Sequence, residues 1–466
     1  MKRIIKRVVI FSLLVYVILL PSWATVAQTE ITDGEVKSIL QDRIDRAKKS
    51  VGIVVGLVDD KGARIISYGK PSQESTQTVN GDSVFEIGSV TKVFTATLLA
   101  DMVERGEVNL NDPISKYLPK SVKTPTRDGK EITLHDLSSQ ISGLPRMPTN
   151  FAPKDNQNPY ADYTVEQMYA FLSNYTLTRD IGAKYEYSNY GVGLLGHILA
   201  LRAATDYETL VRTRIAQPLK MDNTRIKFTP EMQAHLAQGH NAALKPVANW
   251  DIPSFAGAGA LRSTVNDLLK FITANLGLSK SPLLTAMQKT HQPQHDTGTP
   301  DLEIGLGWHI LKKFDTEIVW HNGGTGGYRS FIGFDKKKRR GVVVLSNSGN
   351  DIDDIGRHLL ESQFQLAKIE TSKVRNAIKL DPKIFDAYVG EYQLAPNLIL
   401  KFSREGDQFF AEATGQGKFE LFAETEKDFF LKVVDAQVTF VKDDKGQVTQ
   451  VVLHQNGTDQ LAKKIK

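Results

Sequence analysis

The chain has 466 residues, a formal net charge of +5 and no cysteine. Without cysteine it forms no disulfide, carries no lipid on an N-terminal cysteine and holds no cysteine-ligated metal. Four basic residues lie within the first seven positions, so the remainder is nearly neutral and gives no reason to expect a nucleic acid or an anionic surface as partner. A chain of this length buries a large core and is expected to form more than one domain.

Residues 1–27 have the pattern of a secretory signal peptide. The basic start is followed by an apolar stretch at 8–20, by Pro21, and by small residues that include Ala24 and Ala27. A membrane-spanning helix usually needs about 18 apolar residues or more, and this stretch is shorter. We therefore expect cleavage after Ala24 or Ala27 and a periplasmic or secreted protein, which meets a membrane only through this segment before cleavage. The alternative is an uncleaved anchor.

The first motif with chemical potential follows a predicted helix at 35–49 and two predicted strands at 51–59 and 63–69. Ser89 stands at the start of a predicted apolar helix, and Lys92 comes three residues later. Residues three apart share one face of a helix, with about 5–6 Å between their Cβ atoms. The Lys92 amine can therefore reach the Ser89 hydroxyl.

This pair of residue types suits nucleophilic catalysis. A serine is a weak nucleophile until a base takes its proton. A lysine buried at a helix N-terminus loses charge through desolvation and the positive end of the helix dipole, so Lys92 can serve as that base or tune one. The same helix start offers backbone N–H groups to an oxyanion. Taken alone, the motif also fits a capped helix with a solvated lysine.

A second motif, Tyr187 and Asn189, precedes a predicted apolar helix at 192–200. The phenol could act as a general base if neighbouring cations lowered its pKa from about 10. The amide could hold a substrate carbonyl and orient the lysine. The structural alternative is an aromatic, capped loop. A polar, turn-rich segment at 150–163 predicts a surface loop near the site.

A third motif, at 321–327, contains His321, Gly323 and Gly324 and lies among predicted strands at 307–311, 317–320, 328–334 and 341–347. A glycine inside a strand often marks the close approach of another backbone. Here that backbone could be the substrate's, paired along the strand edge. The structural alternatives are a glycine-rich hairpin and a histidine that supports the fold.

The pattern changes near the C-terminus. A helix is predicted at 351–367 and a linker at 373–382. Eight short strands are then predicted, at 389–394, 398–403, 408–414, 419–424, 429–434, 437–441, 448–454 and 460–465. Short strands at this spacing indicate a small barrel or sandwich, and the segment contains no catalytic motif.

The three motifs are specific in their order and separation. With residues 85–92, 187–189 and 321–323, the chain resembles the serine β-lactamase and penicillin-binding superfamily, in the branch of class C β-lactamases and soluble D-alanyl-D-alanine peptidases. The resemblance covers about 50–366 and includes the flanks 141–145, 261–264 and 307–308. The tail from about 380 resembles the lipocalin-like β domain that some members append.

The resemblance implies an α/β (α+β) fold in which helices flank an antiparallel sheet beside a helical lobe. The signal peptide would be followed by a hydrolase domain (28–372), the linker (373–382) and a barrel-like β domain (383–466). It implies that Ser89 is the nucleophile and that Lys92 and Tyr187 transfer protons. Asn189, His321 and Gly323 would bind substrate, and the N–H groups of Ser89 and Gly324 would form the oxyanion hole. It implies no cofactor and no metal.

One position departs from the class C pattern, because His321 stands where those enzymes carry a lysine that helps to bind the substrate carboxylate. A histidine with a pKa near about 6.5 is mostly neutral at pH 7, which weakens that attraction. The expected function is an exported serine hydrolase that forms an acyl-enzyme on D-alanyl peptides or β-lactams. The alternatives are an esterase or D-aminopeptidase on the same scaffold, and a non-catalytic penicillin- or peptidoglycan-binding protein that uses the tail as its contact module.

Overall fold

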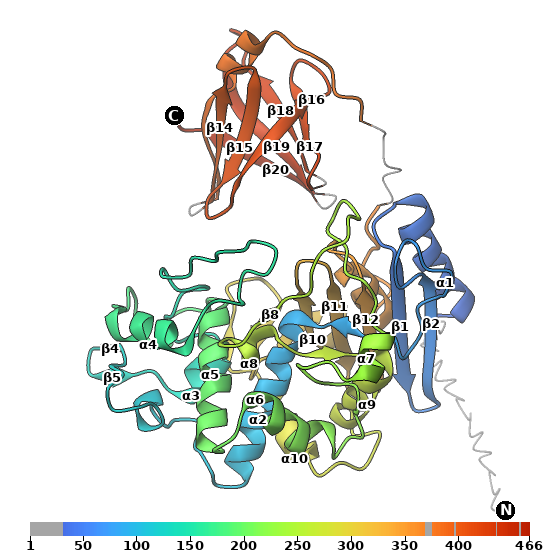
Figure 1. The fold of residues 1–466 in the computed structure, drawn as a ribbon, viewed down its shortest axis with the longest axis vertical. Helices are drawn as coiled ribbons and strands as arrows, with labels where there is room; N and C mark the ends of the chain where they lie inside the picture. Colours follow the sequence, from blue (N-terminus) through green and yellow to red (C-terminus); the bar gives the residue numbers. More distant parts are fainter. Residues whose placement is uncertain (1–30, 369–374, 396–397, 435, 456–457) are drawn as a thin grey trace, which may run out of the picture.

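The computed structural model describes residues 31–368, 375–395, 398–434, 436–455 and 458–466. The predicted signal peptide lies outside the described residues. The large domain is organised around an eight-stranded antiparallel sheet in the order β2-β1-β12-β11-β10-β9-β8-β7 (Figure 1). Its strands are β1 (Gly52–Asp59), β2 (Gly62–Gly69), β7 (His295–Asp296), β8 (Leu302–Ile304), β9 (His309–Lys313), β10 (Thr316–Gly324), β11 (Arg329–Asp335) and β12 (Arg340–Ser346).

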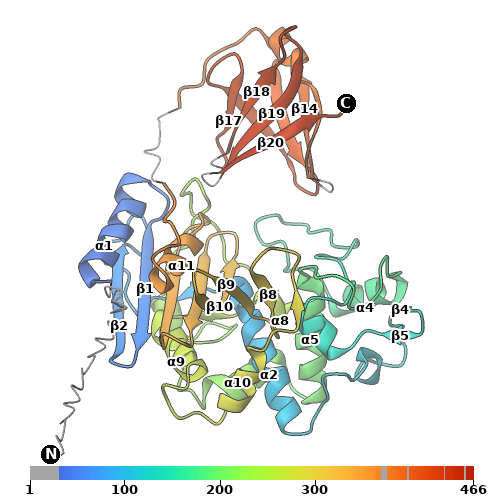
Figure 2. The same cartoon turned by 180° about the vertical axis from the view of Figure 1, so that it is seen from behind.

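Both faces of the sheet are covered. In β1 the side chains of Val54 and Val58 join the core on one face, whereas Ile53, Val55 and Leu57 join the core on the other. This explains why β1 is apolar throughout rather than alternating. The first face is covered by α2 (Thr91–Glu104), α9 (Val265–Asn275) and α10 (Leu284–Thr290), and the second by α1 (Asp33–Gln41) and α11 (Asp353–Leu360), as Figures 1 and 2 show.

A helical lobe lies beside this sheet and confirms the predicted architecture (Figure 1). It contains α3 (Leu134–Ser138), α4 (Val165–Asn174), α5 (Asn189–Arg202), α6 (Tyr207–Val211) and α8 (Ala256–Gly259). Figure 1 shows α7 (Pro230–Ala234) away from this lobe, on the side of β1 and β12. Helices α5 and α8 approach closely at Gly196 and Gly257, where a Cβ on Gly196 would lie 2.7 Å from the Gly257 Cα. Two small ribbons pair β3 (Phe85–Glu86) with β6 (Arg262–Ser263) and β4 (Thr126–Arg127) with β5 (Lys130–Glu131).

Two predicted helices differ from the structure at their ends. The helix predicted at 35–49 consists of α1 followed by a π-helical turn, Asp42–Arg46. The helix predicted at 351–367 is shorter, because α11 ends where Glu361 becomes extended (φ −148°, ψ 110°). The Asp354 carboxylate then accepts a hydrogen bond from the Ala367 N–H, which turns the chain back along the helix.

The eight C-terminal strands close into a barrel (Figure 2). They are β13 (Gly390–Ala395), β14 (Leu398–Glu405), β15 (Gln408–Ala413), β16 (Lys418–Ala423), β17 (Asp428–Leu431), β18 (Ala436–Lys442), β19 (Val448–Gln455) and β20 (Thr458–Lys464). Closure is made by pairing of β13 with β20, and aromatic side chains such as Tyr392, Phe409 and Phe440 fill the interior. The described part of the predicted linker already contacts this barrel, since Ile378 N–H donates to the Ala423 carbonyl.

Among the described residues, no helix combines the length and apolar character needed to cross a bilayer.

Candidate active site

Ser89 lies in a 3₁₀ turn, Gly88–Val90, between β3 and α2. The turn is anchored on both sides, because Ile87 N–H donates to the Leu261 carbonyl (3.1 Å) and the Ser330 hydroxyl donates to the Ile87 carbonyl (2.7 Å). Gly88 has a φ of +48°, which favours glycine. Ser89 is partly exposed, whereas Lys92 on the first turn of α2 is completely buried.

The Lys92 amine contacts three oxygen atoms. Its Nζ lies 2.9 Å from the Ser89 Oγ, 2.9 Å from the Asn189 Oδ1 and 2.7 Å from the Ala258 carbonyl oxygen. The predicted contact between Lys92 and Ser89 is therefore confirmed. Burial and the nearby Arg146 cation lower the Lys92 pKa well below 10.5, as expected for a lysine taken out of water.

This arrangement orients the amine in its neutral form. The Asn189 and Ala258 oxygens can only accept hydrogen bonds, so they take both N–H groups of a neutral amine. The nitrogen lone pair then faces the Ser89 hydroxyl at 2.9 Å, where it accepts the hydroxyl proton. In its charged form the amine donates a third hydrogen bond to Ser89 instead. Lys92 is thus placed as a base for Ser89.

The second motif is positioned by the start of α5. The Ser188 hydroxyl caps this helix by accepting from the Gly191 N–H (2.8 Å) and donates to the Pro145 carbonyl (2.7 Å). The Asn189 N–H donates to the Arg146 carbonyl (3.0 Å). These bonds tie the segment before α5 to the loop 145–147, and they direct the Asn189 amide toward Lys92.

The Tyr187 ring covers the lysine, with 4.8 Å between the Lys92 Nζ and the ring centroid. Burial raises the pKa of Tyr187 to about 12, and a hydrogen bond with Ser89 and the Arg146 charge oppose this only in part. The condition for Tyr187 to act as a general base, a pKa lowered below about 10 by neighbouring cations, is therefore not met, because burial outweighs the Arg146 charge. At neutral pH the phenol is protonated and can donate a hydrogen bond at the Ser89 hydroxyl.

Strand β10 brings two glycines against the Ser89 turn. After Trp320, β10 no longer pairs with β9, so the segment from His321 to Gly324 pairs within the sheet with β11 alone. On its other side, a Cβ on Gly323 would lie 2.9 Å from the Ser89 N, and a Cβ on Gly88 would lie 2.7 Å from the Gly324 N. Only glycine allows this approach, which places the backbone nitrogens of Ser89 and Gly324 at one site.

His321 is 1% exposed and lies behind Tyr187, with 6.3 Å between the ring centroids. Its ring centroid is 5.1 Å from that of His309, and its Nδ1 contacts the Asn322 carbonyl oxygen (2.6 Å). Burial, His309 and Lys92 lower the His321 pKa well below 6.5. The expectation of a pKa near 6.5 is therefore wrong, and His321 supplies no cation at or slightly below neutral pH.

A pocket of about 320 Å³, open solvent included, lies beside Ser89. Its polar side is formed by Ser89, Asn189 and Gly324. Its apolar side is formed mainly by Tyr160, Trp250 and Phe255, whose rings contact one another at centroid distances of 5.4 Å (Tyr160–Trp250) and 6.1 Å (Tyr160–Phe255). Tyr160 belongs to the turn-rich segment 150–163, which confirms the prediction of a loop near the site.

The comparisons with known proteins agree with this geometry. The family model described as Beta-lactamase matches residues 37–362, more than half of the chain. The chain belongs to the Beta-lactamase family. It is similar to "Beta-lactamase" of Pseudomonas fluorescens (26% identical over 352 residues, 68% of this chain and 93% of the relative). It is also similar to "D-alanyl-D-alanine-carboxypeptidase/endopeptidase AmpH" of Escherichia coli K12 (28% over 336 residues, 68% and 86%).

A solved structure titled D-alanine carboxypeptidase AmpC, from Burkholderia cenocepacia, is 26% identical with a TM-score of 0.59, and the match covers 71% of this chain and all of that one. Residues 374–464 match a second family model, Domain of unknown function (DUF3471). The protein is therefore a serine hydrolase of the Beta-lactamase family with a DUF3471 domain, which here is the C-terminal barrel.

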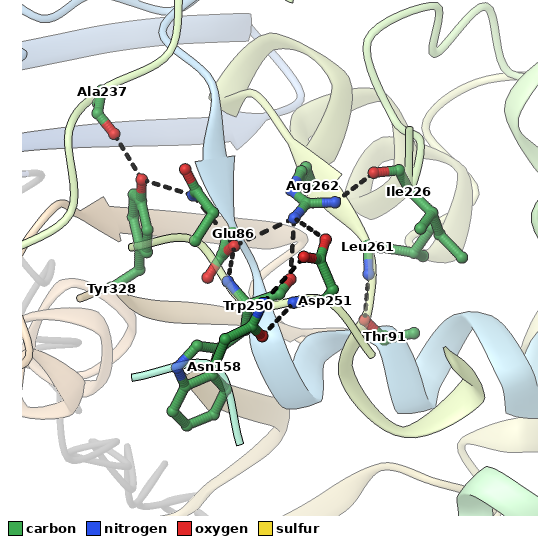
Figure 3. Close-up of polar contacts among 11 residues, drawn as sticks. Glu86, Thr91, Asn158, Ile226, Ala237, Trp250, Asp251, Leu261, Arg262 and Tyr328 are labelled. Atoms are coloured by element: carbon green, nitrogen blue, oxygen red, sulfur yellow. Dashed lines mark hydrogen bonds and ion pairs between the residues drawn. The ribbon is translucent and has the colours of Figure 1, made fainter. Parts of the chain in front are cut away.

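A buried ion pair supports the pocket of this Beta-lactamase family member (Figure 3). Glu86 and Arg262, both about 4% exposed, lie 3.3 Å apart. Glu86 also accepts from the Trp250 N–H (2.8 Å), and the Trp250 carbonyl accepts from Arg262 (2.9 Å). The pair thus holds both polar groups of the Trp250 backbone, and Figure 3 shows the two charged groups converging beside it. Burial raises the Glu86 pKa.

Four contributors to this family member's site were missed by sequence reasoning: the Ala258 carbonyl, Arg146, Trp250 and Glu86. A carbonyl has no residue-type signal, so Ala258 could not be found from the sequence. Glu86 and Arg262 both stand within segments that carried the resemblance, at 85–92 and 261–264. Their pairing through β3 and β6 was not visible, because 176 positions separate them.

Proposed function

We propose that this protein is an exported serine acyl-hydrolase that forms an acyl-enzyme on Ser89. Its substrates are D-alanyl peptides, cleaved as by a DD-carboxypeptidase or endopeptidase, or β-lactams. The observation that carries the proposal is the position of the buried Lys92 Nζ, which lies 2.9 Å from the Ser89 Oγ, 2.9 Å from the Asn189 Oδ1 and 2.7 Å from the Ala258 carbonyl oxygen. With a neutral amine this geometry leaves the lone pair to the Ser89 hydroxyl. Relatives named as β-lactamase and as D-alanyl-D-alanine-carboxypeptidase/endopeptidase support these substrate classes.

Acylation begins when the Lys92 amine takes the Ser89 proton and the Oγ attacks the substrate carbonyl carbon. The negative charge that develops on the carbonyl oxygen is stabilised by the N–H groups of Ser89 and Gly324. The intermediate collapses as the carbon–nitrogen bond breaks, and the leaving nitrogen takes a proton from the Lys92 ammonium or through the Tyr187 phenol. The products are an ester on Ser89 and an amine, which is released from a peptide and stays attached to the acyl group of an opened β-lactam.

Deacylation repeats these steps with water. Lys92 is neutral again once the leaving group has taken its proton, so it can take a proton from the attacking water. The carbon–oxygen bond to Ser89 then breaks, and the serine oxygen regains a proton from Lys92. The net reaction adds one water across the scissile amide, and the enzyme returns to its starting state.

A second candidate is an esterase or D-aminopeptidase on the same scaffold. The observation that favours it is the buried His321, which is neutral where class C enzymes carry a lysine. A site without that cation depends less on a substrate carboxylate and accepts neutral acyl donors. A non-catalytic binding protein is disfavoured, because Ser89, Lys92 and Tyr187 lie in mutual contact beside an open pocket.

Intact-mass analysis tests the acyl-enzyme. The protein is treated with a penicillin and with a fluorophosphonate, and we expect an adduct that is lost in Ser89→Ala and kept in Ser115→Ala, which changes an exposed serine. Rates are then compared for a chromogenic cephalosporin, a D-alanyl-D-alanine peptide and a neutral nitrophenyl ester. An adduct on another residue, or none with any acyl donor, would exclude the mechanism.

A further inference from the structure

The side chains that line the pocket beside Ser89 supply no cation for an anionic substrate group. The residues that line it include no lysine or arginine among the described part of the chain. The Arg329 guanidinium lies against Gly324, but its Nε–H is engaged by the Gly349 carbonyl (2.8 Å). Lys92 is buried and its amine is already engaged with three oxygens. His321 is buried and neutral. A carboxylate on the substrate would therefore need a positive charge from elsewhere.

Arg146 stands at the edge of the site with its side chain exposed. Its guanidinium carbon lies 5.1 Å from the Tyr187 ring centroid, so the cation rests on the face of the ring that covers Lys92. Its backbone carbonyl accepts from the N–H groups of Asn189 (3.0 Å) and Tyr190 (3.2 Å). The backbone of Arg146 is thus held against the start of α5, next to Asn189, whose amide oxygen contacts Lys92.

The guanidinium of Arg146 is free to bind a ligand. Over the described ranges of the chain, no hydrogen bond or ion pair engages it, and the ring that it contacts there is that of Tyr187. An arginine presents five N–H donors in a planar arrangement that matches the two oxygens of a carboxylate. Its charge acts on the site, because it lowers the pKa values of both Lys92 and Tyr187.

We propose that Arg146 binds a carboxylate of the substrate and so performs the role that the residue at position 321 does not. This inference rests on the proposed acyl-hydrolase function and narrows it to acyl donors with an anionic group near the scissile bond. Both a D-alanyl peptide with a free C-terminus and a β-lactam carry such a group. The Tyr187 ring contacts the guanidinium without neutralising it, and the Arg146 side chain remains exposed to an incoming anion.

The test compares two acyl donors that differ in one carboxylate, a phenyl ester of phenylacetylglycine and its 3-carboxyphenyl counterpart. The measured quantity is kcat/KM for the anionic ester divided by kcat/KM for the neutral ester. For Arg146→Gln we expect this ratio to fall roughly tenfold, because the KM of the anionic ester increases. For Arg146→Lys we expect a ratio between those of the unmodified protein and Arg146→Gln, because lysine retains the charge but not the paired N–H geometry. Because any change in the Lys92 pKa affects both esters, the ratio isolates substrate binding.

The matched control is Lys37→Gln, which removes an exposed cation on α1, on the other side of the sheet, and should leave the ratio unchanged. Added salt should lower the ratio of the unmodified protein toward that of Arg146→Gln. We also measure kcat/KM for a D-alanyl-D-alanine peptide and for a cephalosporin, in the unmodified protein and in Arg146→Gln. The substrate whose kcat/KM falls is the one whose carboxylate contacts Arg146, and a fall with either substrate supports the inference. An unchanged ratio in a folded Arg146→Gln protein would overturn the inference. Failure of both esters to acylate Ser89 in the unmodified protein would instead refute the proposed function.

Discussion

The Nζ of Lys92 lies 2.7 Å from the carbonyl oxygen of Ala258, a residue 166 positions later in the chain. A backbone carbonyl accepts hydrogen bonds and carries no titratable proton, so it orients the amine at every pH. The Ala258 carbonyl and the Asn189 amide oxygen contact the Lys92 nitrogen from two directions, and Ser89 contacts it from the third. The charge of one buried amine therefore decides whether the serine is activated.

The first prediction concerns pH. Because only neutral Lys92 accepts the Ser89 proton, kcat/KM should rise as the pH increases through the lowered Lys92 pKa and level off below pH 10.5. Asn189→Asp places a negative charge beside the amine and should move this rise to higher pH. The measurement is a profile of kcat/KM for a neutral ester from about pH 5 to 10. A rate that keeps increasing up to the ordinary lysine pKa would show that Lys92 is charged in the folded protein.

Tyr187→Phe should slow acylation by roughly 10²–10⁴-fold, because it removes a proton donor at the Ser89 hydroxyl. The pH at which the rate rises should stay nearly the same, since the phenol has a pKa of about 12 and does not titrate there. The control is Tyr185→Phe, whose hydroxyl contacts His309 instead (3.0 Å) and whose loss should cost less. The double variant Lys92→Ala/Tyr187→Phe tests whether the two residues act together, and we expect its loss of rate to be far from the sum of the two single losses. Additive losses would show that Lys92 and Tyr187 do not act as one proton-transfer unit.

Trp250→Ala should reduce the preference for acyl donors with an aromatic side chain. The indole forms the apolar side of the pocket with Tyr160 and Phe255, and an aromatic contact contributes about 0.5–1.5 kcal/mol, which corresponds to a loss of up to about tenfold. The measurement is kcat/KM for a phenylacetyl ester against an acetyl ester of the same alcohol. An equal loss for both esters would mean that Trp250 supports the fold of the pocket rather than contacts the substrate.

Glu86→Ala should destabilise the protein by about 3–5 kcal/mol, because it leaves the buried Arg262 without its carboxylate. Asp251→Asn is the matched control. Its side chain is 71% exposed and lies 3.9 Å from the same guanidinium, so the change should stay within about 0.5 kcal/mol. Denaturant unfolding measures both values. Similar stabilities for the two variants would show that Arg262 is satisfied by the carbonyls of Trp250 and Ile226 alone.

A chain that ends at Lys368 should remain folded and turn over a neutral nitrophenyl ester at most of the rate of the full chain. The residues of the site lie before this point, and the barrel has its own hydrophobic core. Thermal unfolding and kcat/KM for a neutral nitrophenyl ester test this. A truncated protein that unfolds cooperatively but is inactive would show that the barrel completes the site.

The sequence by itself determined the parts of the protein that depend on local geometry. Helical periodicity places Lys92 on the same face as Ser89, and the contact follows from a spacing of three residues. Period-two patterns and turn residues located the eight C-terminal strands, each of which overlaps an observed strand. The strand pattern alone left a barrel or a sandwich open, because closure depends on pairing of β13 with β20 across most of the tail. The resemblance implied a barrel-like domain, and the structure confirms it.

Only the tertiary structure decided the charge states of the site. The pKa values of Tyr187 and His321 depend on how much water the fold removes and on which charges it brings near, and neither follows from the residue type. For the same reason Arg146 was not recognised: it directly follows the flank 141–145 that resembled the family, and its position on the Tyr187 ring arises from contacts between its loop and the start of α5. Long-range packing sets the local dielectric and the distances between charges, and those quantities control the chemistry of Ser89.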